Sequence, residues 1–117
     1  MYDYNSKILA IIDGDTIDVE IDVGFSIKTV RRLRLARIDT DELHDRDVAK
    51  KAKAKEAKDY LEKLLIKYNY ECMIVTQKTD AFGRYLAELY VGMELINVNS
   101  LMITEGLAKI WVKGSKN

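Results

Sequence analysis

The 117-residue sequence contains no proline and a single cysteine, Cys72. One cysteine cannot form an intramolecular disulfide, and nothing else in the sequence indicates an oxidising compartment. Cys72 begins an apolar run, residues 72–75, where we expect a small buried hydrophobic side chain and not a reactive thiol. No apolar run approaches membrane-spanning length, and residues 1–9 lack the features of a signal peptide. We therefore expect a cytoplasmic protein without membrane contact, a secreted form with a removed leader being the alternative.

An excess of either charge is also missing, since 19 Lys and Arg balance 19 Asp and Glu. Proteins that bind nucleic acid non-specifically gain affinity from excess positive charge. A nucleic-acid-binding function would therefore need local charge, including a metal ion, or would be weak. The 48% hydrophobic and 32% charged residues exclude a disordered or fibrous chain. We expect one domain over residues 1–117, without linker or repeat, and a monomer.

Hydrophobic periodicity predicts five strands. The first, Ile8–Ile12, ends at the turn signal Asp13-Gly14. Residues 15–23 then alternate strictly between apolar and polar, which places Asp15 on the apolar face at the first position of a strand. A basic third strand follows over Ile27–Ile38. The last two strands are predicted over Glu71–Gln77 and Tyr85–Val91, separated by a turn at residues 80–83.

Two helices complete the predicted fold. Residues 46–68 form a long amphipathic helix whose apolar positions recur at steps of three and four: Ala54, Ala57, Leu61, Leu64 and Tyr68. We interpret the lysines opposite this stripe as a solvated face: Lys50, Lys51, Lys53, Lys55 and Lys58. Asn97 can cap a short helix that ends at Gly106, and Leu107–Val112 is a last apolar segment. This order predicts an α+β fold, a five-stranded OB-fold β-barrel with one long and one short packed helix.

Three clusters, residues 13–16, 34–42 and 80–84, carry residue types suited to chemistry. Each alone is more often a turn or a solvated loop. However, a carboxylate at position 15 on an apolar face is costly to desolvate unless a cation or donor meets it. Asp39, Asp41 and Glu42 crowd three acids into four residues, a repulsion that a divalent ion would relieve. Oxygen ligands without cysteine or paired histidine indicate calcium or magnesium, not zinc, and the single histidine, His44, is interpreted as a surface residue.

Four motifs occur in order: Asp13-Gly14-Asp15-Thr16, Arg34 followed by Asp39-Thr40 and Glu42, Gly83-Arg84, and Gly106-Leu107-Ala108-Lys109. In this order and spacing the sequence resembles the staphylococcal nuclease (thermonuclease) family. The match runs from about Ile11 to Lys109, nearly the whole chain. The resemblance implies an OB-fold barrel that hydrolyses the DNA and RNA backbone with Ca2+ and leaves 3′-phosphate ends.

The resemblance also implies roles for particular residues. Asp15 and Asp39 would bind calcium through their carboxylates, and Thr40 through its backbone carbonyl. Glu42 would orient or deprotonate the attacking water, and Arg34 and Arg84 would hold the scissile phosphate. Because Arg34 and Asp39 lie on opposite faces of an ideal strand, both reach one site only if the strand bends, bulges or ends between them.

The sequence departs from the family pattern at three places. Asp41 replaces a proline before the catalytic glutamate, and Ala81-Phe82 replaces Lys-Tyr before Gly83-Arg84. The nucleotide-stacking tyrosines have no match near the C-terminus, where Trp111 is interpreted as a stacking, core or lid residue. These changes predict weaker affinity or another substrate preference. They also keep open a catalytically inactive module that binds nucleic acid or protein, and a structural OB domain.

Overall fold

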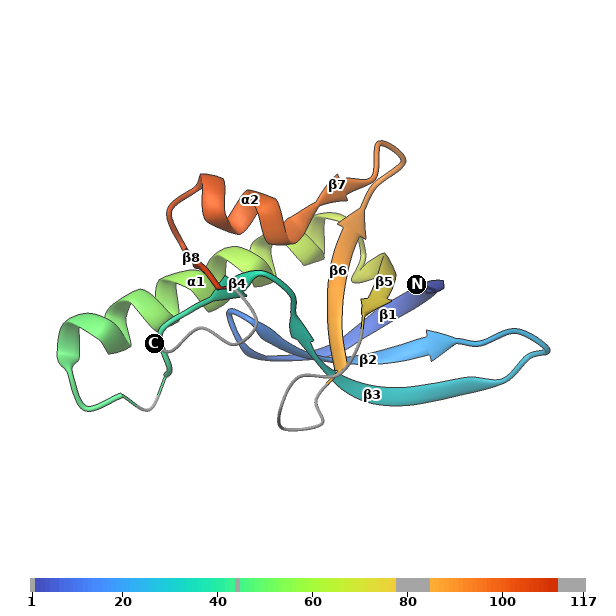
Figure 1. Ribbon diagram of the computed structural model, residues 1–117, viewed down its shortest axis with the longest axis horizontal. Coiled ribbons are helices and arrows are strands. Elements are labelled where there is room, and N and C mark those ends of the chain that lie inside the picture. The colour runs from blue at the N-terminus through green and yellow to red at the C-terminus, as the bar shows by residue number, and fades with distance from the viewer. Residues whose placement is uncertain (1, 44, 78–84, 112–117) are drawn as a thin grey trace.

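The computed structural model describes residues 2–43, 45–77 and 85–111. Its barrel is built from β1 (Tyr2–Asp13), β2 (Thr16–Asp22), β3 (Lys28–Leu35), β5 (Glu71–Gln77) and β6 (Tyr85–Val91). The strands are hydrogen-bonded in the order β3-β2-β1-β5-β6, and a parallel pairing of β3 with β6 closes the barrel (Figure 1). The predicted five-stranded OB-like barrel of an α+β fold is confirmed.

Two helices and three short strands complete the described architecture. The long helix α1 (Val48–Lys67) and the short helix α2 (Val98–Thr104) lie on one side of the barrel, and the β2–β3 hairpin extends away from them (Figure 1). Strand β7 (Ile96–Asn97) pairs with β6, and β4 (Ile38–Asp39) pairs with β8 (Lys109–Ile110) in a separate two-stranded sheet. None of the described helices is long and apolar enough to cross a membrane.

The core confirms both predicted periodicities. On β2, Ile17, Val19 and Ile21 are buried, whereas the polar residues between them are not. On α1 the fully buried positions are Ala54, Ala57, Leu61 and Leu65, so the apolar stripe faces the barrel as predicted. Burying such side chains stabilises the fold by roughly 25 cal/mol for each Å² of apolar surface removed from water.

Two strand predictions are wrong in their extent. Strand β1 begins at Tyr2, well before Ile8, because residues 2–7 pair along their whole length with β5. Ser6 is buried while Asn5 and Lys7 are exposed, a pattern of period two among polar residues. The predicted third strand, Ile27–Ile38, is in fact two strands, β3 and β4, interrupted at residues 36–37.

Both helices are capped by side chains. The long helix begins at Val48, two residues later than predicted, because Asp47 Oδ1 accepts hydrogen bonds from the amides of Ala49 and Lys50 at 2.9 and 3.2 Å. Asn97 caps α2 as predicted, since its Oδ1 accepts from the amide of Ser100 at 2.9 Å. The turn predicted at residues 80–83 lies outside the described residues.

Candidate active site

Strand pairing brings Asp15 and Arg34 together at one end of the barrel. The amide of Leu35 donates to the carbonyl of Asp15 at 2.8 Å, and Thr16 is the register partner of Arg34. The Arg34 guanidinium then reaches the Asp15 carboxylate, with 3.3 Å between Nη1 and Oδ2. Both residues are at most 8% exposed, so a salt bridge lies in the buried end of the barrel.

The Asp15 carboxylate is met by protein donors on both oxygens. Oδ1 accepts from the Thr16 hydroxyl at 3.0 Å, and Oδ2 accepts from the Thr40 amide at 3.1 Å in addition to facing Arg34. The prediction that this buried carboxylate requires a donor or cation is therefore confirmed for donors. These contacts pin the loop after β4 to the start of β2.

The break between β3 and β4 lets Arg34 and Asp39 face the same site. Arg37 adopts a left-handed backbone conformation with φ 68°, which ends β3 and redirects the chain. As a result, Arg34 Nη2 lies 3.3 Å from Asp39 Oδ1, and Arg34 Nη1 donates to the carbonyl of Ile38 at 3.1 Å. Of the routes considered from strand parity, the structure uses the one in which the strand ends.

A polar network, which sequence reasoning missed, surrounds this break. Arg37 donates to both carboxylate oxygens of Glu88, at 2.7 and 3.0 Å, and to the Ser100 hydroxyl. The hydrogen bonds to Glu88 raise the pKa of the Arg37 guanidinium. Asn99, which is completely buried, donates to the carbonyls of Ala36 and Ala87. These partners lie 12 to 63 residues apart, so no local pattern indicates them.

Thr40 lies in a tightly packed position between the first turn and α1. A Cβ placed on Gly14 would come within 2.9 Å of Ala57 Cβ and 3.0 Å of Thr40 Cγ2. Only glycine therefore permits this approach of turn, loop and helix. The Thr40 hydroxyl oxygen is buried without a hydrogen-bond partner among the described parts of the chain. It is an uncommitted oxygen on the residue that follows Asp39.

The oxygen groups at this end of the barrel are of the chemical types that bind a hard divalent cation. Asp15 and Asp39 supply carboxylates, and Thr40 supplies neutral oxygens, which are the ligands that calcium prefers. Both carboxylates also face Arg34, at 3.3 Å each. Within residues 2–43, 45–77 and 85–111, no three His, Cys, Asp or Glu side chains gather as a metal site. The sequence crowding of Asp39, Asp41 and Glu42 thus does not produce a three-carboxylate cluster there.

Of the other predicted catalytic residues, the structure describes Glu42 alone. Glu42 lies on the exposed loop after Thr40, where its carbonyl accepts from the amide of Asp45 at 3.1 Å. Arg84 and His44 lie outside the described residues. The structure thus brings together Asp15, Arg34, Asp39 and Thr40. The catalytic roles of Glu42 and Arg84 stay predictions.

Strand β8 carries Trp111 onto Arg34. The centre of the Trp111 ring lies 5.3 Å from Arg34 Cζ, a distance at which an aromatic face attracts a cation. The Trp111 amide donates to the carbonyl of Arg37 at 2.8 Å, which extends the β4–β8 pairing by one bond. Sequence reasoning left stacking, core and lid roles open for this residue, and its contact in the structure is with the guanidinium.

A cavity of about 240 Å³ adjoins the site on the side of α1. Asp39 and Thr40 form part of its wall, together with Lys50 and Lys53 of the helix and Lys109 of β8. Of the five lysines in the predicted solvated face, Lys58 is half-buried and the other four are exposed. However, Lys50 and Lys53 also flank the candidate site, a position that the helical pattern alone does not reveal.

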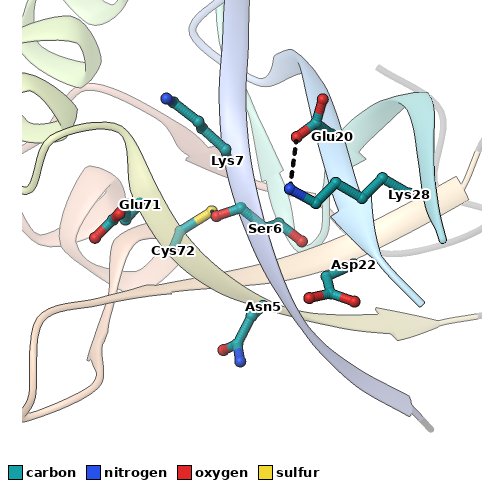
Figure 2. A pocket seen from close by; sticks show the side chains of 8 residues that line it. All are labelled: Asn5, Ser6, Lys7, Glu20, Asp22, Lys28, Glu71 and Cys72. Carbon is teal, nitrogen blue, oxygen red and sulfur yellow. Dashed lines mark hydrogen bonds and ion pairs between the residues drawn. The ribbon is translucent and has the colours of Figure 1, made fainter. Parts of the chain in front are cut away.

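A second polar groove lies at the other end of the strands and has different chemistry. Figure 2 shows its lining by β1, β2 and β5, with an ion pair of 3.7 Å between Lys28 and Glu20. Cys72 contributes to the wall, and its thiol points at the carbonyl of Ser6, 3.6 Å away. Burial raises the pKa of the Cys72 thiol to about 12. The expected unreactive role of Cys72 agrees with this environment, because the thiolate is the reactive form.

Comparison with known proteins finds a nuclease family and several relatives. The sequence model of the family described as "Staphylococcal nuclease homologue" matches residues 32–117. The chain is 29% identical to a micrococcal nuclease of Shigella flexneri over 91% of its length, and 31% identical to a thermonuclease of Staphylococcus hyicus over 88%. It is also 32% identical to protein ParB of Escherichia coli over 87%. The chain spans 54 to 58% of the lengths of these relatives.

Proposed function

Because the chain belongs to the staphylococcal nuclease family, we propose that it is a calcium-dependent phosphodiesterase that hydrolyses DNA, RNA or both and leaves 3′-phosphate ends. The observation that carries this proposal is the convergence of Asp15, Arg34, Asp39 and Thr40 from separate segments. In this arrangement the two carboxylates would hold a cation, and the guanidinium between them would bind a phosphate.

Arg34 is suited to bind the scissile phosphate. Attack on phosphorus places negative charge on the phosphoryl oxygens, and a guanidinium can donate two parallel hydrogen bonds to them. Its distances to Asp15 and Asp39, 3.3 Å each, exceed the 2.7–2.9 Å typical of strong charge-assisted bonds. By contrast, Arg37 and Glu88 approach to 2.7 Å. We infer that Arg34 can share its donors with substrate, whereas Arg37 is committed to the fold.

Asp15, Asp39 and an oxygen of Thr40 would hold calcium. When bound there, the ion would supply electrostatic stabilisation of the phosphoryl oxygens. Without it, Asp15 and Asp39 present negative charge to an incoming phosphate, which would oppose binding. This reasoning explains why a chain with zero net charge would need a cation to bind its substrate.

Glu42 and Arg84 complete the proposed machinery. The exposed carboxylate of Glu42 follows Thr40 by two residues, close enough along the chain to reach water near the site. There it would take the proton of the attacking water, a contribution of typically about 10²–10⁴-fold. Arg84 would donate to the same phosphoryl group as Arg34.

A second candidate function is a non-catalytic module that binds nucleic acid or protein. The observation favouring it is that Arg34 is only 7% exposed and already faces two carboxylates. A guanidinium held in this way also suits a purely structural ion pair. The two candidates differ in one respect, because only the nuclease requires that Arg34 contact the scissile phosphate.

Cleavage assays test the proposal. Single- and double-stranded DNA and RNA are incubated with calcium, magnesium or chelator, and the product ends are mapped. We expect calcium-dependent cleavage with 3′-phosphate ends, and a loss of about 10²–10³-fold in kcat for Arg34→Ala. Glu42→Ala and Arg84→Ala should also lose most activity.

Arg31→Ala is the matched control. Arg31 lies on the same strand, is exposed, and its guanidinium donates to the carbonyl of Val30. Its replacement should leave the rate within about twofold, as expected for a surface change away from the site. Cleavage that survives loss of Arg34, Glu42 and Arg84 would reject the site, and binding without cleavage would favour the module.

A further inference from the structure

Backbone pairing with residues 37–39, the segment that Arg34 also contacts, places Trp111 next to Arg34. The pairs Ile38–Ile110 and Asp39–Lys109 join β4 to β8, and the amide of Trp111 donates to the carbonyl of Arg37. Arg34 in turn donates to the carbonyl of Ile38. Trp111 and the Arg34 guanidinium are therefore hydrogen-bonded to two adjacent residues, Arg37 and Ile38. These bonds hold the indole ring centre 5.3 Å from Arg34 Cζ.

The contacts of Arg34 divide into edge and face. Asp15, Asp39 and the carbonyl of Ile38 bind its N–H groups. Such hydrogen bonds prefer the plane of the guanidinium, so they leave rotation of the side chain out of that plane less restricted. The ring of Trp111 restrains that motion, because an aromatic face attracts a guanidinium cation lying over it.

We propose that Trp111 is a positioning residue that orients the Arg34 guanidinium for the phosphate. This inference rests on the proposed function, because it assigns Trp111 a role in the binding of the same phosphate. Trp111 acts through Arg34 and touches neither the attacking water nor the phosphorus. Misplacement of a phosphate-binding fork is costly in rate, because catalysis here depends on positioning.

A first experiment needs no activity. Trp111 is the single tryptophan of the chain, so tryptophan emission comes from this residue alone. Emission spectra and acrylamide quenching are recorded without metal or substrate for wild type, Arg34→Ala and the exposed control Arg31→Ala. We expect a shifted emission maximum and altered quenching for Arg34→Ala and wild-type behaviour for Arg31→Ala. Identical spectra for wild type and Arg34→Ala would overturn the contact.

A second experiment separates positioning from packing. Trp111→Phe and Trp111→Tyr keep an aromatic face, whereas Trp111→Leu keeps only apolar bulk. We expect Trp111→Leu to lower kcat about tenfold with KM changed less, and the aromatic variants to retain most of the rate. Equal kcat for Trp111→Leu and wild type would show that the ring only packs, and would reject the proposal.

A double-mutant cycle provides the last arm. If Trp111 acts through Arg34, Trp111→Leu should have no further effect on the residual rate of Arg34→Ala. Additive losses would contradict the proposal. If wild type cleaves nothing, the proposed nuclease function fails, and the fluorescence arm still decides whether the indole rests on Arg34. Failure of the two proposals is therefore distinguishable.

Discussion

The Arg37 guanidinium donates to both oxygens of Glu88, at 2.7 and 3.0 Å, across 51 residues of sequence. The pair stabilises Arg37 in a left-handed backbone conformation, which ends β3. Because the strand ends there, the side chains of Arg34 and Asp39 can contact each other. A left-handed conformation at a residue other than glycine costs roughly 1–2 kcal/mol. The side-chain hydrogen bonds offset this cost. The geometry of the candidate site therefore depends on contacts that lie outside it.

Replacing Glu88 with alanine should destabilise the protein. Glu88 is buried and also accepts from Asn97 Nδ2 at 3.0 Å, so its loss leaves several donors without their acceptor. We expect a fall of about 2–3 kcal/mol in the free energy of unfolding, measured by urea denaturation. The rate of cleavage should also fall, because the turn that positions Asp39 is loosened.

Asp18→Ala is the matched control for that experiment. Asp18 also binds an arginine through both oxygens, with Arg32 at 2.8 and 3.1 Å, but this pair is exposed. Exposed ion pairs contribute little, so the midpoint of unfolding should hardly change. Equal destabilisation by the two substitutions would contradict the role given to Glu88.

The fold should tolerate neither removal of the Asn99 carboxamide nor its replacement by an ionisable carboxyl group. It donates to the carbonyls of Ala36 and Ala87 and accepts from the amide of Leu89 at 3.0 Å. Asn99→Ala removes these three buried hydrogen bonds, although the Ala87 carbonyl keeps the Ala36 amide as a donor at 2.8 Å. The substitution should lower the free energy of unfolding by about 3 kcal/mol. Asn99→Asp keeps the shape but turns a carboxylate towards two carbonyls.

The pH dependence of Asn99→Asp follows from that geometry. Burial beside carbonyl oxygens raises the pKa of a carboxyl group, so folding favours its protonated form. Its stability relative to wild type should therefore be greatest at acid pH and decline as the pH rises. Urea denaturation at pH 5 and pH 8 measures this difference, and a stability relative to wild type that increases with pH would contradict it.

Much of this arrangement could be predicted from the sequence, for identifiable reasons. The alternation over residues 15–23 fixed both the strand and the burial of Asp15, because one face of a barrel strand must be apolar. The spacing of three and four along residues 46–68 likewise fixed the buried face of α1. Both patterns lie within a single element, so they can be recognised in the sequence without knowing which distant residues pack against that element.

The break between β3 and β4 could not be predicted in the same way. Arg37 is neither glycine nor asparagine, so nothing at its own position indicates a left-handed backbone. Its conformation depends on Glu88, Asn97, Asn99 and Ser100, which come from distant segments. The contact of Trp111 with Arg34 depends on the same break, and was out of reach for the same reason.

Lys50 and Lys53 provide a test of substrate contact next to the site. Because they line the cavity that contains Asp39 and Thr40, the double variant Lys50→Gln/Lys53→Gln should raise KM several-fold and weaken its dependence on salt concentration. The control is Lys51→Gln/Lys55→Gln, which removes the same charge from the same helix outside that cavity. Equal effects of both variants would show that only overall charge matters.

Cys72 should make the fold sensitive to alkaline pH. Burial raises its pKa from 9.0 to about 12, so the folded state keeps the thiol protonated after the unfolded chain has released its proton. Its contribution to stability is complete below pH 9 and is lost by about 1.4 kcal/mol per pH unit above it. Urea denaturation under reducing conditions at pH 7.5 and 10.5 measures this loss.

Cys72→Ala is the reference, because it removes this titration and leaves the tyrosines and lysines unchanged. The difference in free energy of unfolding between wild type and Cys72→Ala should therefore move in favour of the variant at high pH. A difference that is the same at pH 7.5 and 10.5 would contradict a buried thiol.

The single-turnover cleavage rate of Arg34→Lys at saturating calcium tests the central claim most directly. Lysine keeps the positive charge at position 34 but lacks the planar fork that donates two parallel hydrogen bonds to phosphate. If Arg34 receives the scissile phosphate, the rate should fall by about 10²-fold or more, with unfolding by urea little changed. A rate equal to that of wild type would contradict the account and reduce Arg34 to a structural partner of Asp15 and Asp39.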